Sequence, residues 1–291
     1  MKTVFALGFF DGVHIGHQAL LTACHHLAQQ HGYEAGVVTF SSHPDTLVLG
    51  KTPLLINTVE DRQYLLLGHK ISQIKVLPFD AALMNMSWQD FLAQLMEAGA
   101  AGFVCGHDFR FGSRGQGNAQ LLADFCLQHA LAYAVVPAQK VGGVVVSSTH
   151  IRKLLADGQM EAAVDFLGHP HVLSGTVVSG RQLGRTIGVP TANLHLPADV
   201  VVPKFGVYAC KAIVDGREYL AVTNIGMRPT VGGHHVTVEA WLLDFEGDLY
   251  GKELTLLFYA FLRPEQKFGS LEALQTQIQT DAQKTKDFFK S

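Results

Sequence analysis

The first segment whose residue types could do chemistry lies at positions 8–17 and reads GFFDGVHIGH. Its glycines let the backbone approach a ligand closely, and the helix predicted to follow offers free N–H groups and the positive end of a dipole. His14 and His17 are three residues apart, so both rings could donate hydrogen bonds to charge that grows on a phosphate during attack. Two histidines at this spacing are usually only solvated, but these lie between a strand and a helix. The turn residues expected to contact phosphate are Gly8, Phe9, Asp11 and Gly12.

A second segment, SSTHIR at positions 147–152, places hydroxyls and N–H groups at the start of another predicted helix. An arginine follows one turn later, and this combination suits a leaving pyrophosphate. Alone, such a segment is usually just a helix cap. Together with the histidine turn, it predicts a second part of the same site. The residues expected to act there are Ser147, Ser148, Thr149 and Arg152.

The C-terminal part carries a longer glycine-rich run, GRQLGRTIGVPTANL at positions 180–194. Thr191 and Asn193 are two residues apart, so they lie on the same face of an extended segment. A hydroxyl and an amide carbonyl are hard oxygen ligands suited to Mg²⁺ held together with ATP phosphates. A hairpin with exposed polar positions would explain any three of these residues but not the whole run. The other residues expected to contact ATP are Gly180, Gly184, Arg185, Gly188 and Pro190, although Arg185 could instead cover the barrel predicted below.

Glu239 is a carboxylate inside an otherwise apolar segment, VTVEAWL at positions 236–242. A carboxylate in such surroundings could serve as general base for a substrate hydroxyl. It could equally point outward in the normal alternation of a strand. The residues of this segment alone leave both interpretations open.

Strands and helices alternate over about the first 155 residues, which predicts a parallel sheet covered on both faces. In such sheets, ligands bind at the carboxyl ends of strands near a switch in strand order. The expected strands are 4–10, 35–40, 74–77, 103–105 and 133–136, and the expected helices follow the turns after residues 17, 58, 87 and 118.

From residue 171 onward the pattern changes to period-2 segments separated by glycine-rich turns, which predicts a small antiparallel barrel. A closing helix over 271–289 places Leu271, Leu274, Ile278 and Phe288 on one apolar face. Two short helices over 148–168 precede the change. We therefore expect two domains, 1–170 of α/β type and 171–291 of all-β type.

Composition excludes several classes. A formal net charge of −3 gives no general basic face for nucleic acid or a membrane surface. No apolar run reaches the roughly 18 residues of a membrane span. The four cysteines are widely spaced, as in a protein with reduced thiols. The first residues resemble a strand rather than an export signal, so we expect a cytoplasmic location.

The tetrapeptide HIGH at positions 14–17 is the signature of the nucleotidylyltransferase superfamily, and positions 147–152 supply its second signature. With GHDFRFG at 106–112 and TFSSHP at 39–44, these motifs resemble the FMN adenylyltransferase half of bacterial bifunctional FAD synthetases. The later motifs resemble riboflavin kinase in the family's order. They lie at 180–193, 205–209, 224–230, 239, 242–245 and 262–268.

The resemblance implies a Rossmann-like nucleotidylyltransferase domain, then a six-stranded riboflavin kinase barrel with a terminal helix. It implies that riboflavin and ATP give FMN, and that FMN and a second ATP give FAD, with Mg²⁺ accompanying ATP. Glu239 would take the proton from the ribityl 5′-hydroxyl, while Thr191 and Asn193 would bind the metal. His14, His17 and Arg152 would stabilise adenylyl transfer. Flavin contacts are expected from His43, Asp108, Phe109, Arg263 and Phe268, although core packing explains Phe268 equally well.

Three positions depart from the family's pattern. Ser42 stands where a proline is usual, Asp108 where some relatives carry Asn, and Trp241 where His is frequent. Trp241 could narrow the flavin pocket or belong to the core. We expect small-molecule partners only, and a monomer or weak homo-oligomer. Two alternatives are an adenylyltransferase for another acceptor, which the kinase-like half disfavours, and a catalytically silent flavin-binding protein, which the intact motif residues disfavour.

Overall fold

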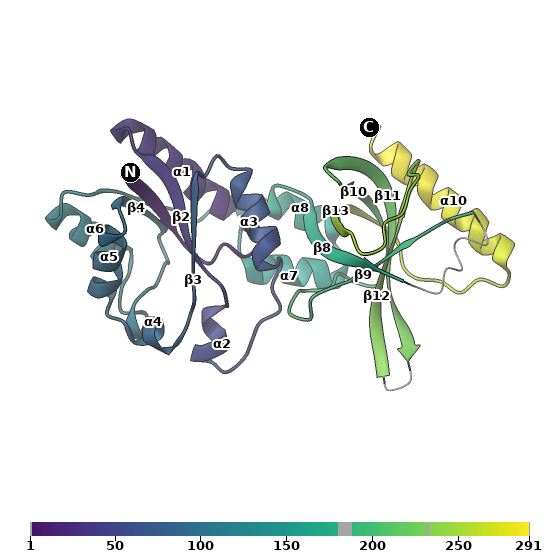
Figure 1. Cartoon of the computed structure of the whole chain (residues 1–291), viewed down its shortest axis with the longest axis horizontal. Coiled ribbons are helices and arrows are strands. Elements are labelled where there is room, and N and C mark those ends of the chain that lie inside the picture. Colours follow the sequence, from purple (N-terminus) through teal and green to yellow (C-terminus); the bar gives the residue numbers. More distant parts are fainter. Residues whose placement is uncertain (1, 180–187, 231–232, 291) are drawn as a thin grey trace. The chain divides into compact units, whose positions relative to one another are not determined.

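The computed structural model describes residues 2–179, 188–230 and 233–290 (Figure 1). By packing, the chain divides into two compact units, each with its own core. The first comprises Met1–Leu55 and Val59–Ser148, and the second comprises Ile56–Thr58 and Thr149–Ser291.

The first unit is built on a five-stranded parallel sheet with the order β3-β2-β1-β4-β5. Strands β1, β2 and β4 are apolar along almost their whole length, as strands covered on both faces must be. This confirms the predicted α/β class. The strands are β1 (Thr3–Leu7), β2 (Glu34–Phe40), β3 (Gln73–Leu77), β4 (Ala100–Gly106) and β5 (Ala132–Val136).

Helices cover both faces of this sheet, and alternate residues of β1 show how. Val4 and Ala6 pack with the buried side of the first helix, whereas Phe5 and Leu7 pack on the opposite face among residues of two later helices. The helices of this unit are α1 (Ile15–His31), α2 (Pro44–Val48), α3 (Val59–Leu67), α4 (Ala81–Asn85), α5 (Trp88–Glu97) and α6 (Ala119–Gln128).

Some elements of this unit lack a sequence prediction. Helices α2 and α4 have five residues each, and strands β6 (Lys140–Val141) and β7 (Val144–Val145) have two each. Elements this short contain too few residues to show a period. The cap at Ser87, by contrast, is confirmed, because its side chain accepts a hydrogen bond from the Asp90 N–H at the start of α5.

The strand order of the first unit predicts the position of a ligand-binding crevice. From β1 the chain builds the sheet outward through β2 and β3, and then returns to the other side of β1 with β4. The carboxyl ends of β1 and β4 therefore form the switch point at which parallel α/β sheets bind ligands. The histidine turn follows β1, and the segment at 106–112 follows β4.

The second unit contains a closed six-stranded barrel, which confirms the predicted all-β half. The strands close in the order β10-β11-β12-β9-β8-β13, and every pairing is antiparallel. The elements are α7 (Ser148–Asp157), α8 (Met160–Leu167), β8 (His171–Val178), β9 (Ala192–His195), β10 (Gly206–Val214), β11 (Arg217–Thr230), β12 (Gly233–Leu242), β13 (Glu253–Arg263) and α10 (Leu271–Phe288).

Helix α10 lies against the outside of the barrel, next to β10 and β11 (Figure 1). Strand β12 shows the resulting two sides: Val238, Ala240 and Leu242 are buried on the inner face. Glu239 and Trp241 alternate with them on the outer face and are half-buried. Glu239 therefore points outward, as strand alternation allows. The outside of the barrel is nevertheless covered at this point.

Candidate functional site

The turn after β1 has a strained backbone. Phe10 has a φ of 61° and Val13 a φ of 38°, and the N–H of Val13 donates to the Phe10 carbonyl at 3.0 Å. A β-branched residue rarely adopts a positive φ, because its side chain crowds the backbone. Surrounding contacts must therefore impose this conformation, and strain of this kind is concentrated at functional sites.

The two histidines of the turn form a stacked pair. Their ring centroids are 3.6 Å apart, with 12° between the planes. His14 is buried, and its Nδ1 accepts a hydrogen bond from the His17 N–H at 3.3 Å, which caps α1. Burial, then the charges of His14 and Arg62, hold the pKa of His17 well below its usual range. His17 is thus neutral at neutral pH and can offer an anion a hydrogen bond but no charge.

A cavity of about 240 Å³ opens at the switch point. The carboxyl ends of β1, β4 and β5 contribute to it, as do the last residues before α7. Ser148 Oγ donates to the Asp11 carbonyl at 2.9 Å, which ties this last segment to the histidine turn. The predicted site residues in its wall are Gly8, Phe9, His14, His17, Asp108, Phe109, Ser147 and Ser148.

Other predicted residues lie elsewhere. Asp11 and Gly12 are buried and are not among the residues that line the cavity. His43 caps α2 through its Nδ1, which accepts from the Asp45 N–H at 3.1 Å, and its ring lies edge-on to Phe9 at 4.7 Å. Thr149 and Arg152 belong to the second compact unit, so their role at this crevice stays a prediction.

Sequence reasoning missed Arg62 of α3. Its side chain is almost completely buried, and it donates to the Phe9 carbonyl at 3.0 Å and the Phe40 carbonyl at 2.6 Å. Its guanidinium carbon lies 4.3 Å from the centre of the Phe9 ring. An arginine in a short helix usually faces solvent. The one available signal is that Arg62 shares a helix face with buried Leu66, four residues later.

In the second unit, polar residues form a row across three neighbouring strands. Asn193 of β9 is directly opposite Glu239 of β12, which is directly opposite Asn224 of β11. Directly opposed residues have Cβ atoms about 4.5–5.5 Å apart on the same face of the sheet. A carboxylate and two amides are therefore brought together by residues far apart in the sequence.

A cavity of about 330 Å³ on the outer face of the barrel is lined by Asn224 and Glu239 of this row, whereas Asn193 is not among its lining residues. Leu271, Leu274 and Ile278 of α10 give it an apolar wall, and Glu239 and Asn224 give it a polar one. Trp241 lines the cavity and also packs against the core cluster under α10. The lining also includes the predicted residues Thr191, Arg263 and Phe268.

Arg263 serves as a structural clamp within this wall. Its Nε and Nη2 contact the Asp281 carboxylate of α10 at 2.7–3.1 Å, and its Nη1 donates to the Pro264 carbonyl at 3.1 Å. Asp281 is 1% exposed and also accepts from Gln277 at 2.9 Å. The pair therefore fixes the end of β13 to the helix that closes the cavity.

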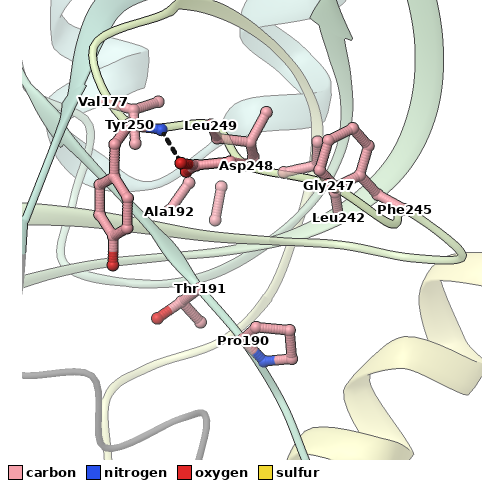
Figure 2. Close-up of a pocket in the computed structure, with 11 residues that line it drawn as sticks. Val177, Pro190, Thr191, Ala192, Leu242, Phe245, Gly247, Asp248, Leu249 and Tyr250 are labelled. Atoms are coloured by element: carbon pink, nitrogen blue, oxygen red, sulfur yellow. Dashed lines mark hydrogen bonds between the residues drawn. The ribbon is translucent and has the colours of Figure 1, made fainter.

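A second, smaller cavity of about 80 Å³ lies at the end of β12 and β9. Figure 2 shows Pro190 and Thr191 on one side and Phe245, Asp248 and Tyr250 on the segment across from them. The Tyr250 N–H donates to Asp248 Oδ1 at 3.0 Å. Thr191 lines both cavities.

The glycine-rich run is only partly described. Gly180, Gly184 and Arg185 lie outside the described residues. Gly188 is exposed and has a φ of 71°, a conformation that suits glycine. Within the described ranges, three or more His, Cys, Asp or Glu side chains do not gather into a metal site. A metal here would depend on hydroxyl, amide and ligand oxygens.

Two family models match separate parts of the chain. The family model described as FAD synthetase matches residues 1–150, and the one described as riboflavin kinase matches residues 167–289. Proteins named bifunctional riboflavin kinase/FMN adenylyltransferase are 35% identical in Listeria monocytogenes and in Bacillus subtilis. Each alignment covers 99% of this chain and 93% of the relative. The Escherichia coli K12 protein of that name is 34% identical, over 98% and 92%.

A solved structure described as a macrolide-efflux protein from Streptococcus pneumoniae matches with a TM-score of 0.87 and 30% identity, covering 98% of this chain and 94% of that one. The efflux activity is part of that protein's description alone. The described part of this chain contains no helix that is long and apolar enough to cross a membrane. The full-length relatives and the two family matches confirm the sequence resemblance: the chain belongs to the bifunctional riboflavin kinase/FMN adenylyltransferase family.

Proposed function

We propose that this chain makes FMN from riboflavin and ATP in its C-terminal half, and FAD from FMN and a second ATP in its N-terminal half. The observation that carries the proposal is that each compact unit has its own cavity with a different set of groups. One set is suited to phosphates and the other to proton abstraction beside an apolar wall. The named relatives join the same two activities in one chain.

In the kinase step, the flavin ring would lie against the apolar wall of α10, with its ribityl chain toward Glu239 and Thr191. The Glu239 carboxylate would accept the proton of the 5′-hydroxyl as that oxygen bonds to the γ-phosphorus of ATP. The bond from the γ-phosphorus to its bridging oxygen breaks, and ADP leaves. No covalent enzyme intermediate is needed, because positioning and charge neutralisation suffice.

Mg²⁺ would enter with ATP. The Thr191 hydroxyl and the Asn193 amide oxygen are hard donors of the kind this ion takes when phosphates supply the rest of its shell. When bound, Mg²⁺ neutralises charge on the transferred phosphoryl group. Thr191 fits this role because it lines both cavities of the barrel. The glycine-rich run, including Gly180, Gly184, Arg185, Gly188 and Pro190, would enclose the nucleotide.

In the adenylylation step, the FMN phosphate would attack the α-phosphorus of ATP, and pyrophosphate would leave. The turn from Gly8 to Gly12 and the start of α1 would bind the phosphates through backbone N–H groups. His14 and His17 would donate hydrogen bonds to the charge that develops on the α-phosphate. The other groups expected to act on the phosphates are Ser147, Ser148, Thr149 and Arg152, and the expected flavin contacts are His43, Asp108 and Phe109.

The remaining expectations concern the organisation of the chain. We propose that residues 1–170 carry adenylylation and residues 171–291 carry phosphorylation. Small molecules are the expected substrates, the protein is expected to be a monomer or weak homo-oligomer, and the expected compartment is the cytoplasm.

A time course of the purified protein with riboflavin and MgATP tests the proposal, with riboflavin, FMN and FAD separated by chromatography. FMN followed by FAD is expected. FMN without FAD, even when FMN is supplied, would contradict the N-terminal assignment. FAD from supplied FMN, but no FMN from riboflavin, would contradict the C-terminal one.

A further inference from the structure

The buried arginine beneath the histidine turn has no part in the reactions described above. Arg62 is 1% exposed, and both of its hydrogen bonds go to backbone carbonyls rather than to a carboxylate. Its Nε is buried without a hydrogen-bond partner among the described residues. A buried charge whose hydrogen bonds go only to neutral groups is costly. Its position therefore points to a role beyond packing.

The two carbonyls that Arg62 holds are at the carboxyl ends of adjacent strands. Phe9 lies two residues beyond the end of β1, and Phe40 is the last residue of β2. The Phe9 carbonyl also accepts from Thr39 Oγ1 at 2.8 Å, so it has two side-chain donors. A peptide group held in this way has a fixed plane, and the next N–H, that of Phe10, is fixed with it.

The Phe9 side chain is held as well. The Arg62 guanidinium lies over its ring, and His43 contacts the same ring edge-on at 4.7 Å. The residue after Phe9 begins the strained part of the turn, where Phe10 and Val13 have positive φ values. Arg62 thus holds the backbone at the point where strain has to be imposed.

Arg62 remains a cation in this environment. Burial lowers its pKa to about 10, while nearby Asp11 and Glu60 act in the opposite direction, so it is protonated at neutral pH. A guanidinium can contact two carbonyls and stack on a ring at the same time, because its donors lie in one plane. A lysine ammonium has no such plane and would reproduce the contacts only in part.

We propose that Arg62 is a positioning residue for adenylyl transfer: through the carbonyls of Phe9 and Phe40 it holds the turn in the conformation that presents its N–H groups and both histidines to the nucleotide. This inference rests on the proposed function of the N-terminal half. Misplacement of catalytic groups by about 1 Å can cost about 100-fold in rate. The effect of Arg62 is therefore expected in the kinetic constants of FAD formation and not in FMN formation.

The test compares Arg62→Met, Arg62→Lys and Thr39→Val with the unchanged chain, measuring kcat and the KM for ATP in the FMN-to-FAD reaction. Riboflavin phosphorylation by the same samples controls for folding of the chain and for active concentration. Circular dichroism and thermal unfolding give the folded fraction. Thr39→Val removes one of the two donors to the Phe9 carbonyl and leaves the buried charge in place.

We expect Arg62→Met to lower kcat/KM for ATP by about 100-fold, with a lower kcat per folded molecule. Arg62→Lys should fall between it and the unchanged chain, and Thr39→Val should show a smaller loss of the same kind. A loss that matches the unfolded fraction, with KM and kcat per folded molecule unchanged, would overturn the proposal. The proposal would also be overturned if Arg62→Met lowered kcat/KM for ATP strongly while Thr39→Val left it unchanged. The effect of Arg62 would then not depend on the Phe9 carbonyl.

If Arg62→Met does not fold, Arg62→Lys and Thr39→Val carry the test by the same criteria. The unchanged chain distinguishes failure of the proposed N-terminal function from failure of the role of Arg62. If it forms no FAD from FMN and MgATP, the proposed function of the N-terminal half fails. If it forms FAD and the variants equal it, only the role of Arg62 fails.

Discussion

The crevice at β1 and β4 and the cavity under α10 are both candidate sites for a phosphate-bearing ligand, but they are built from different parts of the chain. The crevice depends on a strained backbone turn, a helix N-terminus and two stacked histidines close together in the sequence. The cavity depends on side chains that strand pairing and one helix bring together from distant positions.

This difference determines what a substitution can do. In the crevice, much of the binding would come from N–H groups that no side-chain change removes, so conformation is the sensitive property. In the barrel cavity, one carboxylate carries the proposed proton transfer, so a single side chain is sensitive. Substitutions that act on one site while leaving the other intact are the direct way to test the comparison.

Replacing Glu239 with Gln should have the largest effect. The amide cannot accept the proton of the riboflavin hydroxyl, so the rate of FMN formation should fall by about 10³-fold. Conversion of supplied FMN to FAD should continue at the normal rate, as measured by chromatography. Glu253→Gln, an exposed carboxylate on β13 outside the cavity, is the matched control. Equal loss of both activities in folded Glu239→Gln would break the separation of the sites.

Replacing His14 with Ala should give the mirror result. It removes the cap of α1 and one hydrogen-bond donor to the phosphates, so FAD formation should fall by about 100-fold while riboflavin phosphorylation continues. The matched control is His26→Ala, an exposed histidine on the same helix. Kinase activity that fell in step with FAD formation would argue against a role confined to the crevice.

Replacing Asp281 with Ala tests whether the cavity of the second unit depends on the ion pair between Arg263 and α10. It leaves the mostly buried Arg263 guanidinium without its carboxylate, which should destabilise the second unit by about 3 kcal/mol. The KM for riboflavin should rise, because α10 supplies the apolar wall. Asp287→Asn, an exposed acid on the same helix, is the control. An unchanged urea midpoint and KM would show that the clamp is dispensable.

The smallest effect concerns pH and His171. Burial, then the charge of His169, lowers the pKa of His171 to about 3, and both ring nitrogens lack hydrogen-bond partners among the described residues. The unfolded chain, in which histidine titrates near 6.5, therefore binds more protons at pH 5 than the folded one. The stability that neutral His171 contributes is present above pH 6.5 and lost as the pH falls, by roughly 2 kcal/mol between pH 7 and pH 5.

Urea unfolding followed by Trp241 fluorescence, in a Trp88→Phe background, measures this loss in the second unit. His171→Leu should reduce the difference between pH 7 and pH 5. His195→Leu, at an exposed position on β9, should leave it in place. An equal pH dependence with and without His171 would assign the acid sensitivity to other groups.

Sequence reasoning found the main strands and helices of both units and several of the groups that line the two cavities. The buried strand β1, the helix start at residue 148 and the alternation around Glu239 are local patterns, visible within a few residues. It did not resolve whether outward-facing Glu239 would meet solvent or a cavity. The answer depends on α10, which begins more than a strand and a loop later in the chain.

Arg62 is a second residue whose contacts could not be predicted from local sequence patterns. Its sequence neighbourhood resembles an ordinary amphipathic helix, and nothing local indicates that its guanidinium meets two carbonyls at the ends of two strands. By itself, the sequence determined the two-part architecture and the chemistry of each motif, because periodicity and side-chain type act over short distances. Only the tertiary structure decided which of these groups share a cavity, because sheet order, barrel closure and the position of α10 depend on contacts between residues far apart in the chain.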